Sequence, residues 1–332
     1  MLANEGLSSR GVMLFGSGFI VKKFQLMDLG LETRADANQL LRPYLNGRDL
    51  LQRPRGAWVI DAFGKTESEL RQGFPEIYEH LLRTVKPQRD KNRDKTISKN
   101  WWLFGRPRSE IRPALENQRR YIATVETAKH RVFEFLDQRI LPDNKILLIA
   151  CSDSLSLGIC QSIIHLQWTY ANCGLIGMAS FEKGHVYVKS KCFDPFPFPD
   201  ATETQRAAIA DIAEELDETR KLAIAETDKL TMTELYNLRE KLRSGEPLSD
   251  KDQRRATAAR AGIVNRLHEQ LDQAVADAYG WGAEWAAGSL GPSEIVARLV
   301  ALNHERAEEE KQGKIRWLRP DYQIPRFAPD RK

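Results

Sequence analysis

The chain has 332 residues, and its 50 Lys and Arg against 46 Asp and Glu leave a formal net charge of only +4. That length suggests two domains, each able to bury a core, and no apolar run reaches the length of a membrane span. Four cysteines are too few for a disulfide scaffold and the first residues do not resemble a secretory signal, so we expect a cytoplasmic protein without a membrane partner.

The first 199 residues predict short mixed elements. Strands are expected at 11–21, 56–64, 145–153 and 185–193, with a tight turn at Gly16–Gly18 in the first of them. Apolar residues at helical spacing predict a helix after Pro75 within 67–85 and a buried helix over 155–171. Three prolines in residues 194–200 forbid helix and ladder alike, which predicts a domain boundary there.

After residue 202 the pattern becomes helical. Amphipathic spacing predicts helices over 204–226, 231–245, 254–280 and 291–313. Thr231 followed by Glu234 is typical of a helix start, and Gly245 of a helix end. The sequence therefore predicts an α+β fold, with a mixed α/β domain over 1–199 followed by an all-helical domain over 200–332.

Two short motifs could be mistaken for methyltransferase chemistry. Residues 15–18, Phe-Gly-Ser-Gly, resemble part of a methyl-donor turn, but Val21 stands where a third glycine is needed, so an ordinary turn is favoured. Residues 194–197, Asp-Pro-Phe-Pro, lack the adjacent prolines of an amino-methyltransferase loop, so a linker is favoured. We therefore expect no catalytic residue and no bound cofactor in this chain.

Metal and acid–base sites are not indicated either. The cysteines lack paired spacing and the six histidines are scattered, so no metal site is expected. Cys151, Cys160 and His165 have apolar neighbours and are predicted to be core residues.

A dense basic segment is the one coherent functional signal. Residues 81–131 contain 14 Lys and Arg against 5 Asp and Glu, whereas residues 201–250 contain 7 against 12. Trp101, Trp102 and Tyr121 are interleaved with these charges, a combination that suits phosphate contacts and base stacking. The alternative is a solvated charged surface with the two tryptophans docked in the core.

Several ordered motifs resemble the target-recognition region and helical tail of MmeI-like DNA methyltransferases, the type IIL restriction–modification enzymes. The longest are Leu41-Arg42-Pro43-Tyr44-Leu45-Asn46-Gly47-Arg48-Asp49-Leu50 and Trp101-Trp102-Leu103-Phe104-Gly105-Arg106-Pro107-Arg108. Shorter ones are Arg120-Tyr121-Ile122-Ala123, Lys129-His130-Arg131-Val132-Phe133, Ala278-Tyr279-Gly280-Trp281 and Ile315-Arg316-Trp317-Leu318-Arg319-Pro320. The resemblance covers nearly the whole chain.

The resemblance implies the DNA-recognition part of an S-adenosylmethionine-dependent N6-adenine DNA methyltransferase of a restriction–modification system. In that family the target adenine of double-stranded DNA is flipped into a separate methyltransferase domain. The catalytic motifs are missing here, so we expect a methyltransferase domain or subunit encoded upstream, which would supply the S-adenosylmethionine site. The alternative is a stand-alone DNA-binding specificity subunit or regulator with no enzymatic role.

The expected DNA contacts lie in the basic segment. Arginine and lysine suit phosphates or guanine, asparagine suits adenine, and glutamate can accept from cytosine. On these grounds the predicted DNA-binding residues are Arg106, Arg108, Asn117, Arg119, Arg120, Glu126, Lys129 and Arg131.

Overall fold

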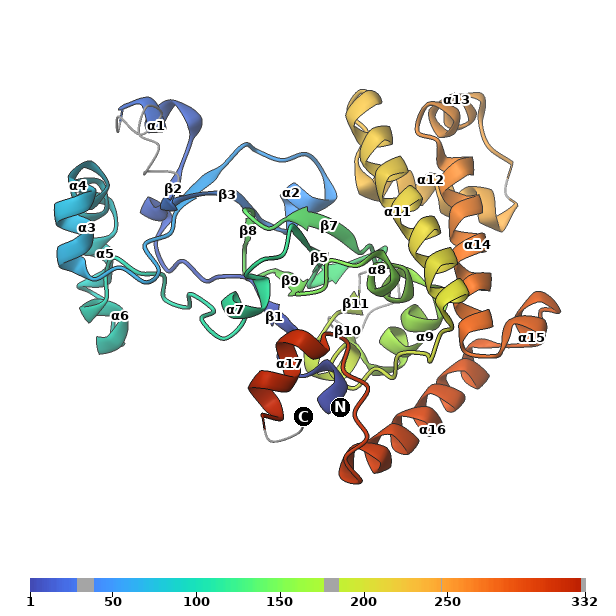
Figure 1. The fold of residues 1–332 in the computed structure, drawn as a ribbon. Coiled ribbons are helices and arrows are strands. Elements are labelled where there is room, and N and C mark those ends of the chain that lie inside the picture. Colours follow the sequence, from blue (N-terminus) through green and yellow to red (C-terminus); the bar gives the residue numbers. More distant parts are fainter. Residues whose placement is uncertain (29–38, 176–184, 246, 330–332) are drawn as a thin grey trace. The chain divides into compact units, whose positions relative to one another are not determined.

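A computed structural model describes residues 1–28, 39–175, 185–245 and 247–329 of the chain, which fold into two compact units (Figure 1). Unit 1 comprises residues 1–9, 114–136 and 147–332, and unit 2 comprises residues 10–113 and 137–146. Small sheets accompany many helices, so the fold class is α+β, as predicted. The boundaries of these two units do not fall at residue 199. The assignment of DNA recognition to residues 1–199 stays a prediction.

Unit 2 is built on a four-stranded sheet in the order β2-β4-β3-β8. Its strands are β2 (Ile20–Val21), β3 (Leu41–Leu45), β4 (Trp58–Ile60) and β8 (Leu141–Pro142). The predicted strand at 56–64 is confirmed as β4, which pairs antiparallel with both β2 and β3, whereas β3 and β8 are parallel. The first predicted strand is confirmed only in part, as β2 after a 3₁₀ turn at Ser17–Phe19 and bridges at Val12 and Met13.

Short helices complete unit 2. They are α1 (Lys23–Asp28), α2 (Gly47–Leu51), α3 (Glu67–Gly73), α4 (Pro75–Thr84), α5 (Lys86–Arg89) and α6 (Lys95–Lys99); α7 (Arg112–Leu115) spans the junction with unit 1. The predicted helix after Pro75 is confirmed as α4, because proline at the first helical position loses no hydrogen bond. The core of this unit includes Phe19, Val59, Ile77, Trp101 and Phe104.

Unit 1 contains a four-stranded sheet in the order β1-β9-β5-β7 and a smaller one in the order β10-β11-β6. The strands are β1 (Ser8–Arg10), β5 (Arg120–Val125), β6 (Thr127–Ala128), β7 (Glu134–Asp137), β9 (Ile146–Ile149), β10 (Gly174–Leu175) and β11 (His185–Val186). The predicted strand at 145–153 is confirmed as β9. The predicted strand at 185–193 ends after two residues and gives way to α10 (Lys189–Cys192). This turn buries the neighbours Cys192 and Phe193 together, which a strand with alternating faces could not do.

The remaining helices belong to unit 1. They are α8 (Ser154–Gln161), α9 (Ile163–Asn172), α11 (Glu203–Glu226), α12 (Met232–Ser244), α13 (Asp250–Ala258), α14 (Ala261–Ala278), α15 (Gly282–Ala286), α16 (Pro292–Lys311) and α17 (Pro320–Phe327). The predicted helices at 204–226, 231–245 and 291–313 are confirmed as α11, α12 and α16. Thr202 starts α11 with a reciprocal capping pair to Gln205.

Two predicted helices are each broken in two. The helix expected over 155–171 is interrupted at Ser162, where the backbone turns extended and the Asp272 carboxylate accepts a hydrogen bond of 2.7 Å from the Ile163 amide. The helix expected over 254–280 is interrupted at Ala259 and Arg260, and Arg260 has a left-handed φ of 56°. The first break lets a distant carboxylate satisfy an N-terminal amide of α9.

The proline-rich segment 194–200 is irregular, as predicted, but it is packed and is no exposed linker. Phe196 is fully buried in the core formed by α9, α11 and α14. The Tyr279 hydroxyl donates to the Pro197 carbonyl at 2.8 Å. The segment therefore fixes the helices after it to the rest of unit 1.

The first residues of the chain are held by its last two helices. The Glu310 carboxylate on α16 accepts hydrogen bonds from the amides of Leu2 and Ala3, at 2.8 and 2.9 Å. The Gln323 amide on α17 donates to the carbonyls of Ala3 and Glu5, at 3.0 and 2.9 Å. Hydrogen bonds between residues more than 300 positions apart therefore join the two ends of this sequence within unit 1.

The predicted core positions of Cys151, Cys160 and His165 are confirmed. Cys151, Cys160 and His165 are buried, and the two cysteines are free thiols. In the four described ranges, no helix is both long and apolar enough to cross a membrane. The same ranges contain no group of three or more His, Cys, Asp or Glu placed to hold a metal ion.

Candidate nucleic-acid interface

Two segments of unit 2 form a short antiparallel ribbon, which we call the arginine ribbon: residues 10–15 and 105–108. Met13 and Arg106 exchange backbone hydrogen bonds of 3.1 and 3.0 Å, and the Gly105 amide donates to the Leu14 carbonyl at 3.3 Å. The Arg108 guanidinium donates through Nε to the Gly11 carbonyl at 3.0 Å. Two of the predicted DNA-binding residues, Arg106 and Arg108, therefore lie on one locally ordered surface.

A buried arginine underlies this ribbon. Arg89 is 1% exposed, and its guanidinium donates to the carbonyls of Leu14 and Leu103, both at 2.7 Å. Burial lowers the pKa of Arg89 to about 10, so the side chain is still charged at neutral pH. Arg89 thus fastens the first strand of the ribbon, and the residue two positions before the second strand, to the core, so its role is structural.

Three arginine side chains of the ribbon lie near one another. Arg106 is exposed, whereas Arg108 is half-buried. Burial lowers the pKa of Arg108, the carboxylate of Glu110 opposes this effect, and the positive charges of Arg106 and Arg10 lower the pKa further. Like charges gathered on a surface produce the positive potential that attracts a polyanion.

The next turn of the chain is held by an ion pair. Arg112 contacts the Asp61 carboxylate at 2.7 Å and donates through Nε to the Pro107 carbonyl at 2.9 Å. Its guanidinium also lies 4.1 Å from the centre of the Phe63 ring. Arg112 therefore orders the segment that carries Arg108 rather than presenting a free charge.

The tryptophans of the basic segment are packed against the fold. Trp101 is 3% exposed and donates to the Glu67 carboxylate at 3.2 Å, and Trp102 donates to the Lys65 carbonyl at 3.0 Å. Tyr121 is fully buried in β5 of unit 1. The interpretation of Trp101 and Tyr121 as stacking residues is wrong, because both side chains are buried in protein, whereas Trp102 is half-buried.

Three predicted residues of unit 1 have exposed side chains. Asn117, which has a left-handed φ of 61°, and Arg119 precede β5, and Lys129 follows β6. The Lys129 ammonium donates to Asn237 at 3.0 Å and lies 3.6 Å from Glu240. It also lines an open pocket of about 590 Å³ that contains three acidic residues, Glu234, Glu240 and Asp252, and two further basic ones, Lys241 and Arg243. The nearby Glu240 carboxylate offsets the charge of Lys129.

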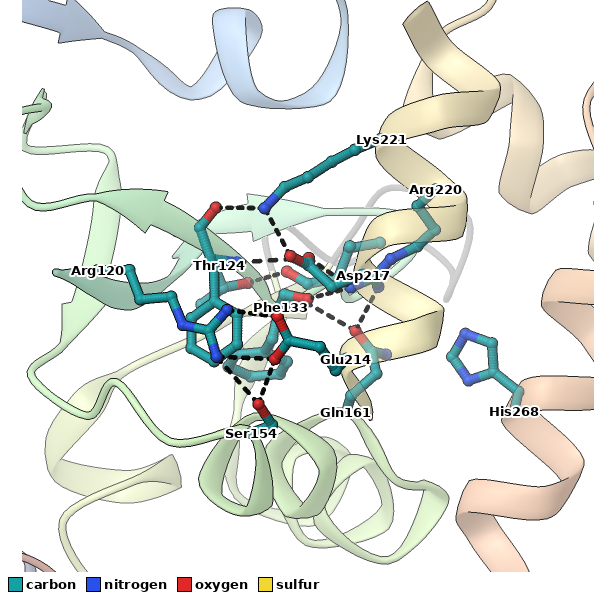
Figure 2. Close-up of polar contacts among 12 residues, drawn as sticks. Arg120, Thr124, Phe133, Ser154, Gln161, Glu214, Asp217, Arg220, Lys221 and His268 are labelled. Atoms are coloured by element: carbon teal, nitrogen blue, oxygen red, sulfur yellow. Dashed lines mark hydrogen bonds and ion pairs between the residues drawn. The ribbon is translucent and has the colours of Figure 1, made fainter. Parts of the chain in front are cut away.

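Arg120 takes part in a polar network between the sheet and α11 (Figure 2). Its guanidinium forms a bidentate pair with the Glu214 carboxylate, at 2.6 and 2.7 Å, and donates to the Ser152 carbonyl at 3.1 Å. Hydrogen bonds from Arg120 lower the pKa of Glu214 to about 2. Because the guanidinium of Arg120 donates to Glu214 and to the Ser152 carbonyl inside unit 1, we infer that this residue has a structural role and does not contact DNA.

Arg131 and Glu126 are also interior residues. Arg131 is 3% exposed, and it donates to the His185 carbonyl at 2.7 Å, to Thr124 at 3.2 Å and to the Val125 carbonyl. Glu126 is 6% exposed. Neither side chain reaches the surface in this structure, so the prediction that they contact DNA is withdrawn.

A second buried arginine joins α11 to β7 and α12 (Figure 2). Arg220 is fully buried, and its guanidinium donates to Asp217 at 3.1 Å, Gln161 at 3.0 Å, the Phe133 carbonyl at 2.8 Å and the Tyr236 hydroxyl at 2.9 Å. Tyr236 in turn lies 2.8 Å from Nε2 of His268. No local pattern predicts this network, because its members come from α8, α11, α12, α14 and the residue before β7.

The glycine turn at residues 16–18 is filled by protein. A Cβ on Gly18 would lie 2.4 Å from the hydroxyl of Thr84, and the Gly18 carbonyl lies 2.9 Å from Nε2 of His80. The glycine is therefore needed for close packing on α4. These residues do not form a cradle for a methyl donor.

Comparison with known proteins identifies the fold. No protein-family model and no curated protein matches the chain. Among solved structures, the type IIL restriction–modification enzyme MmeI in complex with DNA is similar over 92% of this chain, with a TM-score of 0.66 and 16% identity. The type IIG restriction endonuclease BpuSI matches over 85% with a TM-score of only 0.29 and 12% identity. The chain spans about a third of the length of each, 36% and 32%.

Proposed function

We propose that this chain is the sequence-specific DNA-recognition part of an adenine-specific, S-adenosylmethionine-dependent DNA methyltransferase of a restriction–modification system. The observation that carries this proposal is the likeness of the fold, over 92% of the chain, to an enzyme whose structure was solved with DNA bound. The motifs quoted above support the same family. The arginine ribbon adds a surface of suitable charge.

Within this proposal, the DNA contacts are made by the four exposed residues of the predicted set together with the half-buried Arg108. These are Arg106, Arg108, Asn117, Arg119 and Lys129. Arginine at the ribbon can neutralise phosphates or bind guanine with both ends of its fork, and Asn117 can pair with adenine. Methyl transfer belongs to a catalytic domain or subunit outside this chain, because the sequence lacks the adjacent prolines of an amino-methyltransferase loop.

Selection of bound duplexes from a randomised DNA pool tests the proposal. We expect one short motif to be enriched by the purified chain at moderate salt. Enrichment of one motif that a co-expressed upstream methyltransferase also methylates would support the methyltransferase role. Enrichment with no such partner would favour the alternative, a stand-alone specificity subunit or regulator. If no duplex is retained at any salt concentration, the chain does not recognise DNA by itself and the proposal fails in this form.

Replacing Arg106 with alanine is expected to weaken DNA binding because an exposed positive charge is lost from the ribbon. If Arg106 contacts a phosphate, affinity falls alike for all sequences and the slope of log K against log salt falls by about one. If it contacts a base, the loss is about 1–3 kcal/mol and one position of the motif is relaxed. Fluorescence anisotropy over a salt series measures both quantities.

Arg266→Ala is the matched control, because it removes the same charge from an exposed site on α14 of unit 1. We expect its affinity and salt slope to equal those of the unmodified chain. Equal behaviour of the two variants would place the DNA contacts away from the ribbon.

A further inference from the structure

Phe15 is an exposed aromatic residue in a backbone conformation that phenylalanine disfavours. Its φ is 50°, in the left-handed region that suits glycine, and its side chain is 43% exposed. This one position thus combines an unfavourable backbone conformation with an apolar ring that is exposed to solvent. A site that carries two unfavourable features in the free protein is a candidate for a role in a bound state.

The direction of the Phe15 ring is fixed by the opposite strand of the ribbon. A Cβ on Gly105 would lie 1.9 Å from Cδ2 of Phe15, so the ring edge occupies the space above the Gly105 backbone. Gly105 and Leu14 are joined by a hydrogen bond, and Leu14 is itself anchored by Arg89. The ring is therefore supported from below while nearly half of its surface is free.

The charges of the arginine ribbon indicate what kind of partner the Phe15 ring would meet. Arg106 follows Gly105 directly, and Arg108 and Arg10 lie close enough for their charges to act on one another, with Glu110 the acidic group in this set. An aromatic ring at one end of a ribbon that also carries cationic side chains fits a partner with an anionic backbone and flat apolar groups in its interior. Nucleic acid has both properties.

We propose that Phe15 is a wedge that stacks against an opened base step of duplex DNA while Arg106 and Arg108 bind the flanking phosphates. This inference rests on the proposed DNA-binding function and adds to it a residue outside the predicted contact set. Insertion of an apolar side chain requires that two base pairs unstack, so a duplex that is already distorted should bind more tightly.

The test compares two labelled duplexes of one sequence, one fully paired and one with a single unpaired thymine, by fluorescence anisotropy. The unmodified chain should prefer the bulged duplex, and Phe15→Ala should reduce that preference about tenfold. Phe15→Trp should retain it, because a larger ring can still stack. Thermal melting of each variant verifies that it is folded.

Phe24→Ala is the control, since Phe24 on α1 is also exposed, at 59%, in the same unit. It should not change the preference, and Arg106→Ala should weaken binding to both duplexes. An unchanged preference in Phe15→Ala, or an equal loss on both duplexes, would overturn the wedge, and the effect of Arg106→Ala would still support DNA binding. If the unmodified chain binds neither duplex, it is the proposed function that fails.

Discussion

Arg220→Ala is expected to lower the free energy of unfolding by about 3–5 kcal/mol, the cost of removing one partner of a buried ion pair. The variant loses the four hydrogen bonds of the guanidinium and leaves one oxygen of Asp217 without its cation. Lys221 still contacts the other oxygen, at 2.5 Å, so the loss should stay within that range. Urea denaturation followed by circular dichroism measures the change.

Arg206→Ala serves as its control on the same helix. Arg206 is exposed and lies 3.7 Å from Glu203, which is itself almost fully exposed. Such surface substitutions usually change stability by less than about 0.5 kcal/mol. If both variants were equally stable, the buried network would not hold α11 to the sheet.

His165→Gln should show a stability deficit that shrinks by roughly 2 kcal/mol as the pH falls from 7.5 to 5. Burial, and secondarily the charge of Arg131, lower the pKa of His165 from 6.5 to about 3. The unfolded chain therefore takes up a proton as the pH falls through 6.5, while the folded chain keeps the imidazole neutral. The folded state of the unmodified chain loses stability over this interval, and glutamine removes that loss.

The comparison must be made between the two proteins at each pH, because other groups titrate in the opposite direction. Burial raises the pKa of Glu134 and of Asp272 to about 7, and a raised carboxyl pKa favours the folded state as the pH falls. His304→Gln, at an exposed position of α16, is the control. A deficit that stays constant with pH would mean that His165 is protonated in the folded state.

The sequence predicted most helices where the local signals were complete. Thr202, Thr231 and Gly245 mark helix ends through contacts within a few residues, and the observed bounds agree. The break at Ser162 has a different origin, since its stabilising carboxylate, Asp272, lies 109 residues away. The apolar period continues across the break, so no local pattern could reveal it.

The arginines illustrate the same limit for the site. Arg106 and Arg131 are one residue type in one basic segment, yet the first is exposed and the second is buried. The difference depends on carbonyl groups such as that of His185, which the fold brings to Arg131 from 54 residues away. Composition therefore indicated an affinity for polyanions, while the choice of contact residues required the structure. Phe15 belongs to the Phe-Gly-Ser-Gly motif of the sequence, but only its left-handed φ and its exposure in the structure single it out as a candidate contact residue.

The clasp of the first residues by α16 and α17 has a consequence for synthesis on the ribosome. The carbonyl of Ala3 can accept its hydrogen bond from the Gln323 amide only after that residue has been synthesised, 320 residues later. At about 5–20 residues per second, this delay lasts some tens of seconds. Throughout that time residues 2–5 lack their hydrogen-bond partners on α16 and α17, so in an interrupted chain this segment is accessible to proteases. Unit 1 can therefore close around its opening segment only after residue 323 has been synthesised.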